Sequence, residues 1–542
     1  MKRISPLLAL VVLMSLLMAA CGPAATTAAP QATQAPATQP PAATTAPEAT
    51  QAPATQAPEA TKAPEATEAP AAGSEITIVL AEDPATLDPH VSEDGNGRAV
   101  NENVYETLVN RAADMSIIPS LATGYEQIDD TTWQFKLNEG IIFHNGEPFN
   151  AEAVVYSVKR IIDPALASDL ISNFQTIVDA VAVDDTTVNI ITSGPDPILP
   201  ARMTFLMIVE PAHAQADVEA FSIHPIGTGP YMFVSWERGV EVVIEANPDY
   251  WGEAPSIQTV HWRPIVEEST RLAALQAGEV DLVFGLLPEQ IDSAPVSAHR
   301  PGLEFPIVLL HNGEGSVLAD VKLRQAINYA VDKEGIAEAI YGGYAVVADG
   351  QVLTPGHFGY NPDVEAYPYD PDMATQLIAE SGYDGSEIRL ESEVGRWLKD
   401  KELVEVIAGQ LVEVGLNVKI NISEFSNYLD ILFDRENRAP MIFVSHDNSL
   451  LDADRTLSGY YSCTGTAASY CNEEVTAMIE TARTETDSAA REAMYHEIVK
   501  TARDEAAHLY LVNFENIYGL SERLNWEPRL DSRLYVSEMS LK

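Results

Sequence analysis

Alternating and helical apolar patterns follow one another along residues 74–542. Trp133 to Leu137 alternates apolar and polar positions, as a half-buried strand does. Residues 138–140 then predict a turn that leads back through residues 141–143. Asn150 is placed to cap a helix, whose apolar positions are Val154, Val155, Val158, Ile161 and Ile162.

Later segments repeat a unit of helix, glycine and strand. In each unit an apolar stripe at helical spacing ends at a glycine, and a short apolar strand pattern follows. The segments are residues 403–414, Gly415 and 418–422; residues 271–276, Gly278 and 280–284; and a helix that ends at Gly382. Helices that lead into buried strands through glycine caps indicate an α/β architecture.

The first residues have the pattern of an export signal. Lys2 and Arg3 precede an apolar run over residues 4–20, which is short for a membrane span and typical of a cleaved signal peptide. Residues 18–21, Met-Ala-Ala-Cys, resemble a bacterial lipobox. We therefore expect a signal peptide over 1–20 and lipidation of Cys21, which holds the chain at the membrane without spanning it.

Residues 21–73 have a different composition from the remainder of the chain. After Cys21 they consist almost entirely of Ala, Pro, Thr, Gln and Glu in near-repeats, with nothing to bury. We expect a disordered, proline-stiffened tether that separates a folded part from the membrane.

Charge limits the partners that this protein can have, and length indicates how many lobes it has. The 80 acidic residues against 32 basic ones give a formal charge of −48, which disfavours nucleic acid and anionic lipid surfaces as partners. Residues 74–542 are too many for one simple core, so at least two lobes are expected.

Cysteine and histidine usage argues against an enzyme. The chain has three cysteines; Cys463 and Cys471 lie close together, and export favours a disulfide between them over a metal site. The 11 histidines are scattered, and neither a His-Glu-x-x-His helix nor a Gly-x-Ser-x-Gly elbow occurs. We therefore expect no catalytic residues, no cofactor and no metal.

Several segments resemble a family of periplasmic and lipoprotein receptors that bind peptides, nickel complexes and, in some members, sugars. The similar segments are residues 86–90, 105–108, 140–151, 227–231, 247–251, 323–333 and 369–371. The match at 323–333, Leu-Arg-Gln-Ala-Ile-Asn-Tyr-Ala-Val-Asp-Lys, is the strongest. Ala153 departs from the family pattern, which usually has Asp there, and we expect that change to affect the start of a helix and not the ligand.

The resemblance implies an α/β, two-lobed periplasmic-binding-protein fold of type II, in the large class with an extra inserted subdomain, and a hinge between the lobes. Ligand contacts from both lobes would stabilise a closed state. The expected boundaries are 74–117, 223–302 and 506–542 for the first lobe, 118–222 for the inserted subdomain and 303–505 for the second lobe.

Peptide-binding relatives hold the ligand's ammonium group with an aspartate in a loop of the second lobe. The corresponding loop is residues 446–454, which contains Asp447, Asp452 and Asp454 and begins at His446. We expect Asp447 to be the ammonium partner, with Asp452 or Asp454 as the alternatives and His446 beside them. The other interpretation is that all three aspartates form turns on a solvated loop.

Arg396 stands near the place where dipeptide-binding relatives have an arginine for the ligand carboxylate. A guanidinium can hold a carboxylate through two parallel hydrogen bonds, which would fix the end of the ligand. The competing interpretation is an exposed loop arginine. Trp236, Trp251, Trp262 and Trp397 offer faces for sugars, although core positions explain most of them.

The resemblance therefore predicts an extracytoplasmic substrate-binding lipoprotein of an ABC importer. It would capture short peptides and deliver them to permease subunits as a monomer, anchored by lipid to the outer face of the cytoplasmic membrane. An oligosaccharide receptor of the same fold and a sensory lipoprotein not coupled to transport are the alternatives.

Overall fold

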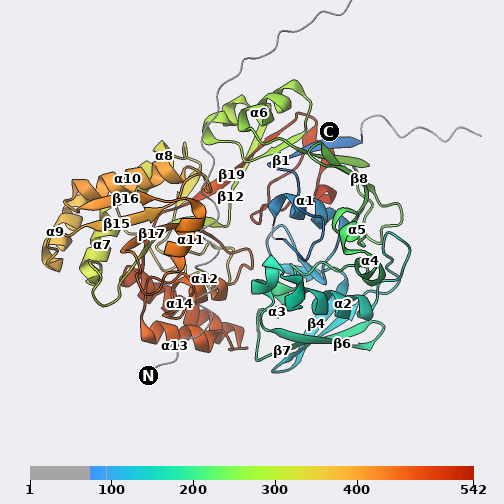
Figure 1. Cartoon of the computed structure of the whole chain (residues 1–542), viewed down its shortest axis with the longest axis horizontal. Coiled ribbons are helices and arrows are strands. Elements are labelled where there is room, and N and C mark those ends of the chain that lie inside the picture. The colour runs from blue at the N-terminus through green and yellow to red at the C-terminus, as the bar shows by residue number, and fades with distance from the viewer. Residues whose placement is uncertain (1–73, 93) are drawn as a thin grey trace, which may run out of the picture. The chain divides into compact units, whose positions relative to one another are not determined.

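The computed structural model describes residues 74–92 and 94–542 and contains two large sheets, each flanked by helices (Figure 1). The first sheet follows the order β12-β19-β11-β1-β10-β9-β8, and β14 pairs with the N-terminal end of β19. Its strands are β1 (Glu75–Leu80), β8 (Tyr231–Glu237), β9 (Glu241–Ala246), β10 (Thr259–Pro264), β11 (Leu282–Phe284), β12 (Val296–Pro301), β14 (Ala345–Val347) and β19 (Val512–Leu520). We call the part built on it the first lobe.

The second sheet has five strands in the order β16-β15-β17-β13-β18. Its strands are β13 (Glu304–Leu310), β15 (Ile388–Ser392), β16 (Val418–Ile422), β17 (Met441–Asp447) and β18 (His508–Tyr510). β15 pairs in parallel with both β16 and β17, whereas β13 runs antiparallel to β17. We call the part built on this sheet the second lobe.

A separate four-stranded antiparallel sheet, β4-β5-β7-β6, lies within the part expected to be the inserted subdomain. Its strands are β4 (Ala122–Asp129), β5 (Thr132–Leu137), β6 (Ile177–Asp184) and β7 (Thr187–Thr192). Two short pairs complete the strands: β2 (Val109–Arg111) with β3 (Ile117–Pro119), and β20 (Leu524–Asn525) with β21 (Ser540–Leu541). The strand predicted from Trp133 to Leu137 is confirmed as β5.

Helices connect and cover these strands. They are α1 (Gly95–Val104), α2 (Ala151–Ile161), α3 (Leu199–Arg202), α4 (Pro211–Ala216), α5 (Val218–Ile223), α6 (Glu268–Ala277), α7 (Val321–Ala330), α8 (Lys333–Ala339), α9 (Pro371–Ser381), α10 (Asp400–Glu413), α11 (Phe425–Phe433), α12 (Ala453–Tyr460), α13 (Glu473–Ala482) and α14 (Ser488–Asp504). Short 3₁₀ turns are η2 (Pro164–Leu166), η3 (Asp169–Asn173), η4 (Pro288–Ser293) and η5 (Val536–Glu538). None of the helices in this part of the chain is long and apolar enough to cross a membrane.

The predicted helix ends are confirmed. Asn150 caps α2, since its side chain accepts a hydrogen bond from the Ala153 N–H at 3.1 Å. Gly278, Gly382 and Gly415 follow α6, α9 and α10 with φ angles of 74°, 73° and 99°. These left-handed conformations favour glycine because it has no Cβ to clash with the backbone. Ala153 lies buried in the first turn of α2, at the start of the helix.

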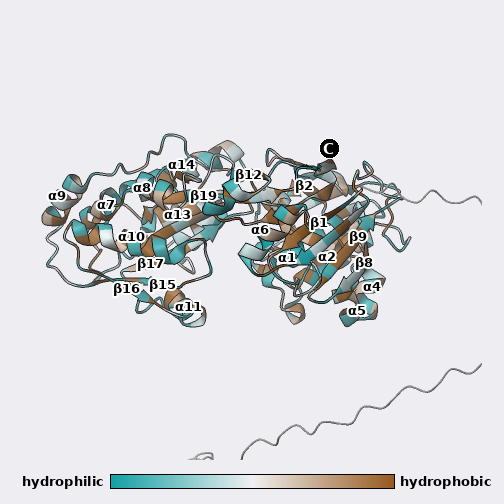
Figure 2. Cartoon of the chain, turned by 90° about the horizontal axis from the view of Figure 1, so that it is seen from above, coloured by the Kyte–Doolittle hydropathy of each residue, from teal (hydrophilic) through white to brown (hydrophobic). Residues whose placement is uncertain are grey.

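Each large sheet has its own apolar core. One face of the second sheet packs against α7, α8 and α10, and the other face packs against α12, α13 and α14. The first sheet encloses a core that contains the fully buried Trp262. Figure 2 shows the apolar residues concentrated on the strands, with hydrophilic positions on much of the surrounding helices. Burial of these side chains, at roughly 25 cal/mol per Å², stabilises each lobe around its own sheet.

The chain passes between the two large sheets through short connections. β12 of the first sheet leads directly into β13 of the second, and β18 of the second sheet leads into β19 of the first. Because β18 still pairs with β13, we propose that the first-lobe segment expected from residue 506 begins after β18. We propose lobe boundaries near Gly302 and Leu511, with the hinge in these two connections.

Four of the segments that resemble the receptor family make contacts in two pairs: 140–151 with 227–231, and 105–108 with 247–251. The His144 ring accepts a hydrogen bond from the Gly227 N–H at 3.3 Å and bonds to the Gly229 carbonyl at 3.0 Å. A Cβ at Gly227 would lie 2.1 Å from the Val104 carbonyl oxygen, so only glycine permits this approach. Glu106 accepts hydrogen bonds from the Tyr250 hydroxyl at 2.9 Å and from the Trp251 indole N–H at 2.8 Å. These segments build the framework of the first lobe.

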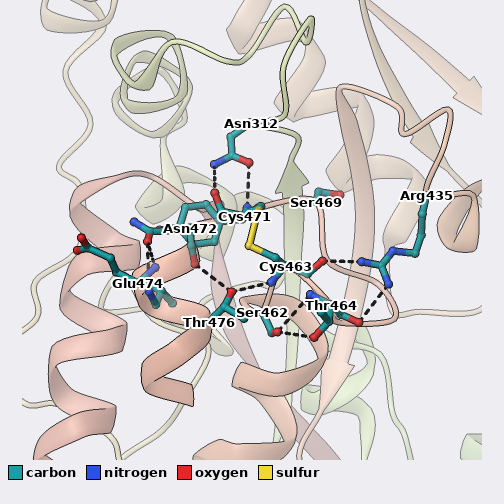
Figure 3. The surroundings of a disulfide bond; sticks show 12 residues. Asn312, Arg435, Ser462, Cys463, Thr464, Ser469, Cys471, Asn472, Glu474 and Thr476 are labelled. Carbon is teal, nitrogen blue, oxygen red and sulfur yellow. Dashed lines mark hydrogen bonds between the residues drawn. A yellow bond between two sulfur atoms is a disulfide. The ribbon is translucent and has the colours of Figure 1, made fainter. Parts of the chain in front are cut away.

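Cys463 and Cys471 are joined by a disulfide bond, which closes a short loop between α12 and α13 (Figure 3). Asn312 exchanges two hydrogen bonds with the backbone of Cys471, and Arg435 donates to the Cys463 carbonyl. With a sequence separation of 8 residues, the chain-entropy contribution is about 2.5 kcal/mol. The bond therefore pins a local loop of the second lobe.

Candidate functional site

The parallel strands of the second sheet end at the edge where β13 begins. Glu304, the first residue of β13, lies opposite Asp447, the last residue of β17. β15 runs parallel to β17, so the segment after Ser392 leaves the sheet at this same edge. In open α/β sheets the carboxyl ends of the strands are the usual place for a ligand. We take this edge as the second-lobe wall of the candidate site.

Asp447 is exposed at this edge. Its carboxylate accepts a hydrogen bond from the Ser449 N–H at 3.0 Å, which forms a tight turn. The next residue, Asn448, is buried and donates to the Asp452 carbonyl and to the Thr456 hydroxyl, both at 2.8 Å. The buried Asn448 side chain therefore holds the loop in place, while the Asp447 carboxylate stays accessible.

Arg396 is exposed in the loop that follows β15. Its guanidinium lies 4.6 Å from the centre of the Phe425 ring, a cation–π distance. Its charge also acts on Glu304: burial raises the pKa of Glu304 and Asp447 adds to this, whereas Ser445 and Arg396 lower it. Arg396, Glu304 and Asp447 thus form one electrostatic group at the strand ends.

His446 points away from this group. Neighbouring residues of a strand face opposite sides, so His446 lies on the other face of β17 from Asp447. It is buried, bonds to the Thr456 hydroxyl at 2.9 Å and packs against the Tyr460 ring. Burial lowers the pKa of His446 to about 3, so it is neutral at physiological pH. The structure places it in the second-lobe core and not beside the Asp447 carboxylate.

Asp452 and Asp454 lie at the start of α12 and are both buried. The Asp452 carboxylate pairs with Arg491 and accepts the Asp454 N–H, so it caps the helix. Burial alone would lower the pKa of Arg491, but the Asp452 charge raises it above its usual value. Asp454 pairs with Arg483 at 3.2 Å. Both carboxylates therefore have arginine partners within the lobe, whereas no ion pair to Asp447 is found among the described residues.

The first lobe has a cavity of about 270 Å³ at the carboxyl ends of its own parallel strands β1 and β11. It is lined by residues that include Leu80, Arg98, Glu102, Phe284 and Arg533. The Glu102 carboxylate lies 3.6 Å from the Arg98 guanidinium and 3.3 Å from that of Arg533. The lining of this cavity is charged and partly apolar, and it comes from the first lobe alone.

The sequence analysis did not identify the residues that line this cavity. Phe284 had a signal, since it ends a predicted strand and remains 39% exposed. No local sequence pattern pointed to Arg98 and Arg533, because they lie 435 positions apart and come together by pairing with Glu102. Glu304 was likewise missed, because its neighbourhood depends on the pairing of β13 with β17.

The other predicted positions have separate surroundings. Cys21 lies outside the described residues. Within residues 74–92 and 94–542, no group of three or more His, Cys, Asp or Glu side chains is arranged to hold a metal ion. The Trp397 ring packs against Tyr428 and Phe443, and the Trp251 indole donates to Glu106. Trp397 is therefore packed within the second lobe, whereas Trp251 remains 40% exposed with its indole N–H held by Glu106.

Comparison with known proteins agrees with this architecture. The model of the bacterial extracellular solute-binding proteins, family 5 Middle, matches residues 116–468. Glutathione-binding protein GsiB of Pectobacterium atrosepticum is 27% identical over 471 residues, which cover 84% of this chain and 91% of that protein.

Solved structures show the same fold. The ABC transporter substrate-binding protein CtaP of Listeria monocytogenes has a TM-score of 0.78 at 24% identity, covering 86% of this chain and 99% of that one. The oligopeptide-binding protein AppA of Bacillus subtilis, solved with a nonapeptide, has a TM-score of 0.69 at 20% identity, covering 86% and 99%. The predicted two-lobed α/β fold is confirmed by these likenesses.

Proposed function

Because the chain belongs to family 5 of the bacterial extracellular solute-binding proteins, we propose that it captures short peptides and delivers them to the permease of an ABC importer. The family consists of receptors for solutes and not of enzymes. The binding step needs no covalent chemistry: a ligand that contacts both lobes shifts the receptor toward its closed state.

The observation that carries the peptide assignment is that a carboxylate and a guanidinium, which carry opposite charges, lie at the same sheet edge. Asp447 offers an accessible carboxylate, and Arg396 offers a guanidinium on a neighbouring strand end. A zwitterionic peptide has an ammonium group and a carboxylate, each of which needs a partner when it leaves water. We assign Asp447 to the ammonium group and Arg396 to the carboxylate. Glutathione, the ligand in the name of a relative, has both kinds of charged group.

The oligosaccharide alternative has less support. Sugar sites use open aromatic faces, whereas the rings of Trp397 and the fully buried Trp262 pack inside the lobes. Trp236 is covered by the Arg238 guanidinium at 3.5 Å. Of the four candidate tryptophans only Trp251 is exposed, at 40%, and Glu106 holds its indole N–H, so sugars have less support than peptides.

A thermal-shift panel tests the assignment. We expect tri-alanine at about 100 times its dissociation constant to stabilise the ligand-stripped protein by about 2.7 kcal/mol, because only the folded state binds it. Blocking both termini should remove the shift. The panel also holds longer peptides, cello- and xylo-oligosaccharides, and nickel with histidine. Stabilisation by oligosaccharides alone would contradict the peptide assignment and leave the receptor assignment standing.

We also propose that the receptor is a monomer anchored by lipid on Cys21 at the outer face of the cytoplasmic membrane. The support is the apolar run that ends at Cys21 and the low-complexity stretch that follows it. A Cys21→Ser variant is expected to leave the membrane fraction for the soluble one. Unchanged fractionation of that variant would contradict the anchor.

A further inference from the structure

The loop that presents Arg396 is built around one buried carboxylate. Asp400 is 3% exposed, and its Oδ2 accepts hydrogen bonds from three consecutive backbone N–H groups. These are the N–H groups of Gly395 at 2.8 Å, Arg396 at 3.1 Å and Trp397 at 3.1 Å. Its Oδ1 accepts the Lys401 N–H at 2.6 Å. Such a concave set of N–H groups stabilises an anion, so Asp400 is ionised.

Side-chain packing fixes the direction of Arg396. Trp397 turns inward, where its ring meets those of Tyr428 and Phe443 at centroid distances of 6.1 and 5.6 Å. Arg396 stays exposed and lies over Phe425, which stacks on Tyr428 in the same helix, α11. Gly395 has a φ angle of 92°, so the backbone turns sharply just before the arginine. The Asp400 carboxylate holds this turn closed from inside.

A second buried carboxyl group lies beside Asp400. Glu393 is 2% exposed, and its Oε1 has no hydrogen-bond partner among the described residues. Burial and the Asp400 charge raise the pKa of Glu393 to about 7, while Arg396 opposes the shift. Two tyrosine hydroxyls also sense this pair: Tyr428 senses Glu393 and Tyr341 senses Asp400, and burial raises the pKa of each well above its usual value. Since Asp400 has four donors, the proton belongs on Glu393.

We propose that Asp400 and Glu393 are positioning residues for Arg396, with an ionised Asp400 shaping the loop and a protonated Glu393 leaving the guanidinium free for the ligand carboxylate. The proposal deepens the proposed function and rests on it, since it takes Arg396 as the carboxylate partner. An ionised Glu393 would compete for the guanidinium and repel the ligand. Binding of a carboxylate should therefore be accompanied by proton uptake and weaken as pH rises through about 7.

Two nearly isosteric variants separate the roles. Isothermal titration is carried out at pH 6.0 to 8.5 with tri-alanine and with its C-terminal amide, using wild type, Asp400→Asn, Glu393→Gln and Glu380→Gln as an exposed control. Asp400→Asn should lose about tenfold in affinity for the free acid and little for the amide. Glu393→Gln mimics the protonated group, so it should keep the pH 6.0 affinity up to pH 8.5. Wild type should lose up to about tenfold over that range, which corresponds to one pKa unit of linkage.

Hydrogen exchange of the ligand-free proteins gives a readout that needs no peptide. The amides of Gly395, Arg396 and Trp397 should be protected in wild type and Glu393→Gln, and exposed in Asp400→Asn. Equal losses for acid and amide, a flat wild-type pH profile, or protected amides in Asp400→Asn would overturn the proposal. If wild type binds neither peptide, the proposed function fails, and the exchange result still decides whether Asp400 shapes the loop. If Asp400→Asn does not fold, the pH profile of Glu393→Gln decides.

Discussion

Replacing Asp447 with asparagine is expected to weaken the binding of a peptide with a free N-terminus by about 100-fold. The variant keeps the size and hydrogen-bonding capacity of the side chain but removes the charge that balances the ligand ammonium. Loss of one partner from a desolvated charge pair costs about 2–5 kcal/mol, and 100-fold corresponds to about 2.7 kcal/mol. Isothermal titration with tri-alanine and N-acetyl-tri-alanine measures the effect, and the acetylated peptide should bind both proteins equally.

Asp384 offers a matched control for this variant. It is exposed, and its carboxylate accepts the N–H of Ser386 at 2.9 Å, just as Asp447 accepts the N–H of Ser449 at 3.0 Å. Asp384→Asn therefore makes the same change in the same kind of turn, away from the sheet edge. Its affinity should equal that of wild type. An equal loss in both variants, or an Asp447→Asn loss that persists with the acetylated peptide, would remove Asp447 from the ligand site.

Asp452→Ala is expected to reduce the free energy of unfolding by about 3–5 kcal/mol. The change leaves the Arg491 guanidinium buried without its partner, because both side chains of the pair are less than 10% exposed. An uncompensated buried charge is among the most destabilising outcomes of a single substitution. Urea unfolding monitored by circular dichroism measures the effect. Affinity for tri-alanine, measured where the variant is folded, should stay close to that of wild type.

Asp454→Ala is the comparison for this variant, since Asp454 begins the same helix. Its partner Arg483 is 40% exposed and can regain water, so we expect a loss of about 1 kcal/mol or less. Should Asp452→Ala instead lose peptide affinity at unchanged stability, Asp452 would be a ligand residue and our structural role for it would be wrong.

Helix ends and strand patterns were predictable because their causes are local. Asn150 caps α2, and the glycines after α6, α9 and α10 adopt the left-handed conformation, as the sequence indicated. Cap chemistry and apolar spacing involve residues a few positions apart, so they can be read without knowing the tertiary structure. The family resemblance additionally predicted the two-lobed fold.

The roles of the resembling segments required the tertiary structure. The sequence shows His144, Glu106 and Gly227 as parts of separate motifs. In the folded chain His144 bonds to Gly227 and Glu106 bonds to Tyr250 and Trp251, so these motifs hold one another in place. Lys333, at the end of the strongest match, is buried and donates to the Asn328 carbonyl at 2.6 Å. These motifs therefore build the framework, whereas the proposed ligand residues Asp447 and Arg396 rest on a separate correspondence with peptide-binding relatives.

By itself, the sequence determined the class of the protein: an α/β receptor with an acidic surface, glycine-capped helices and a loop rich in aspartate. It favoured Asp447 over Asp452 and Asp454 only through the family resemblance, because all three have the composition of turn residues. Only the tertiary structure shows how their surroundings differ, since Arg491 and Arg483 pair with Asp452 and Asp454 while Asp447 is exposed. Arg396, Glu304 and Asp447 likewise become neighbours through strand pairing, a contact between distant residues that no local pattern records.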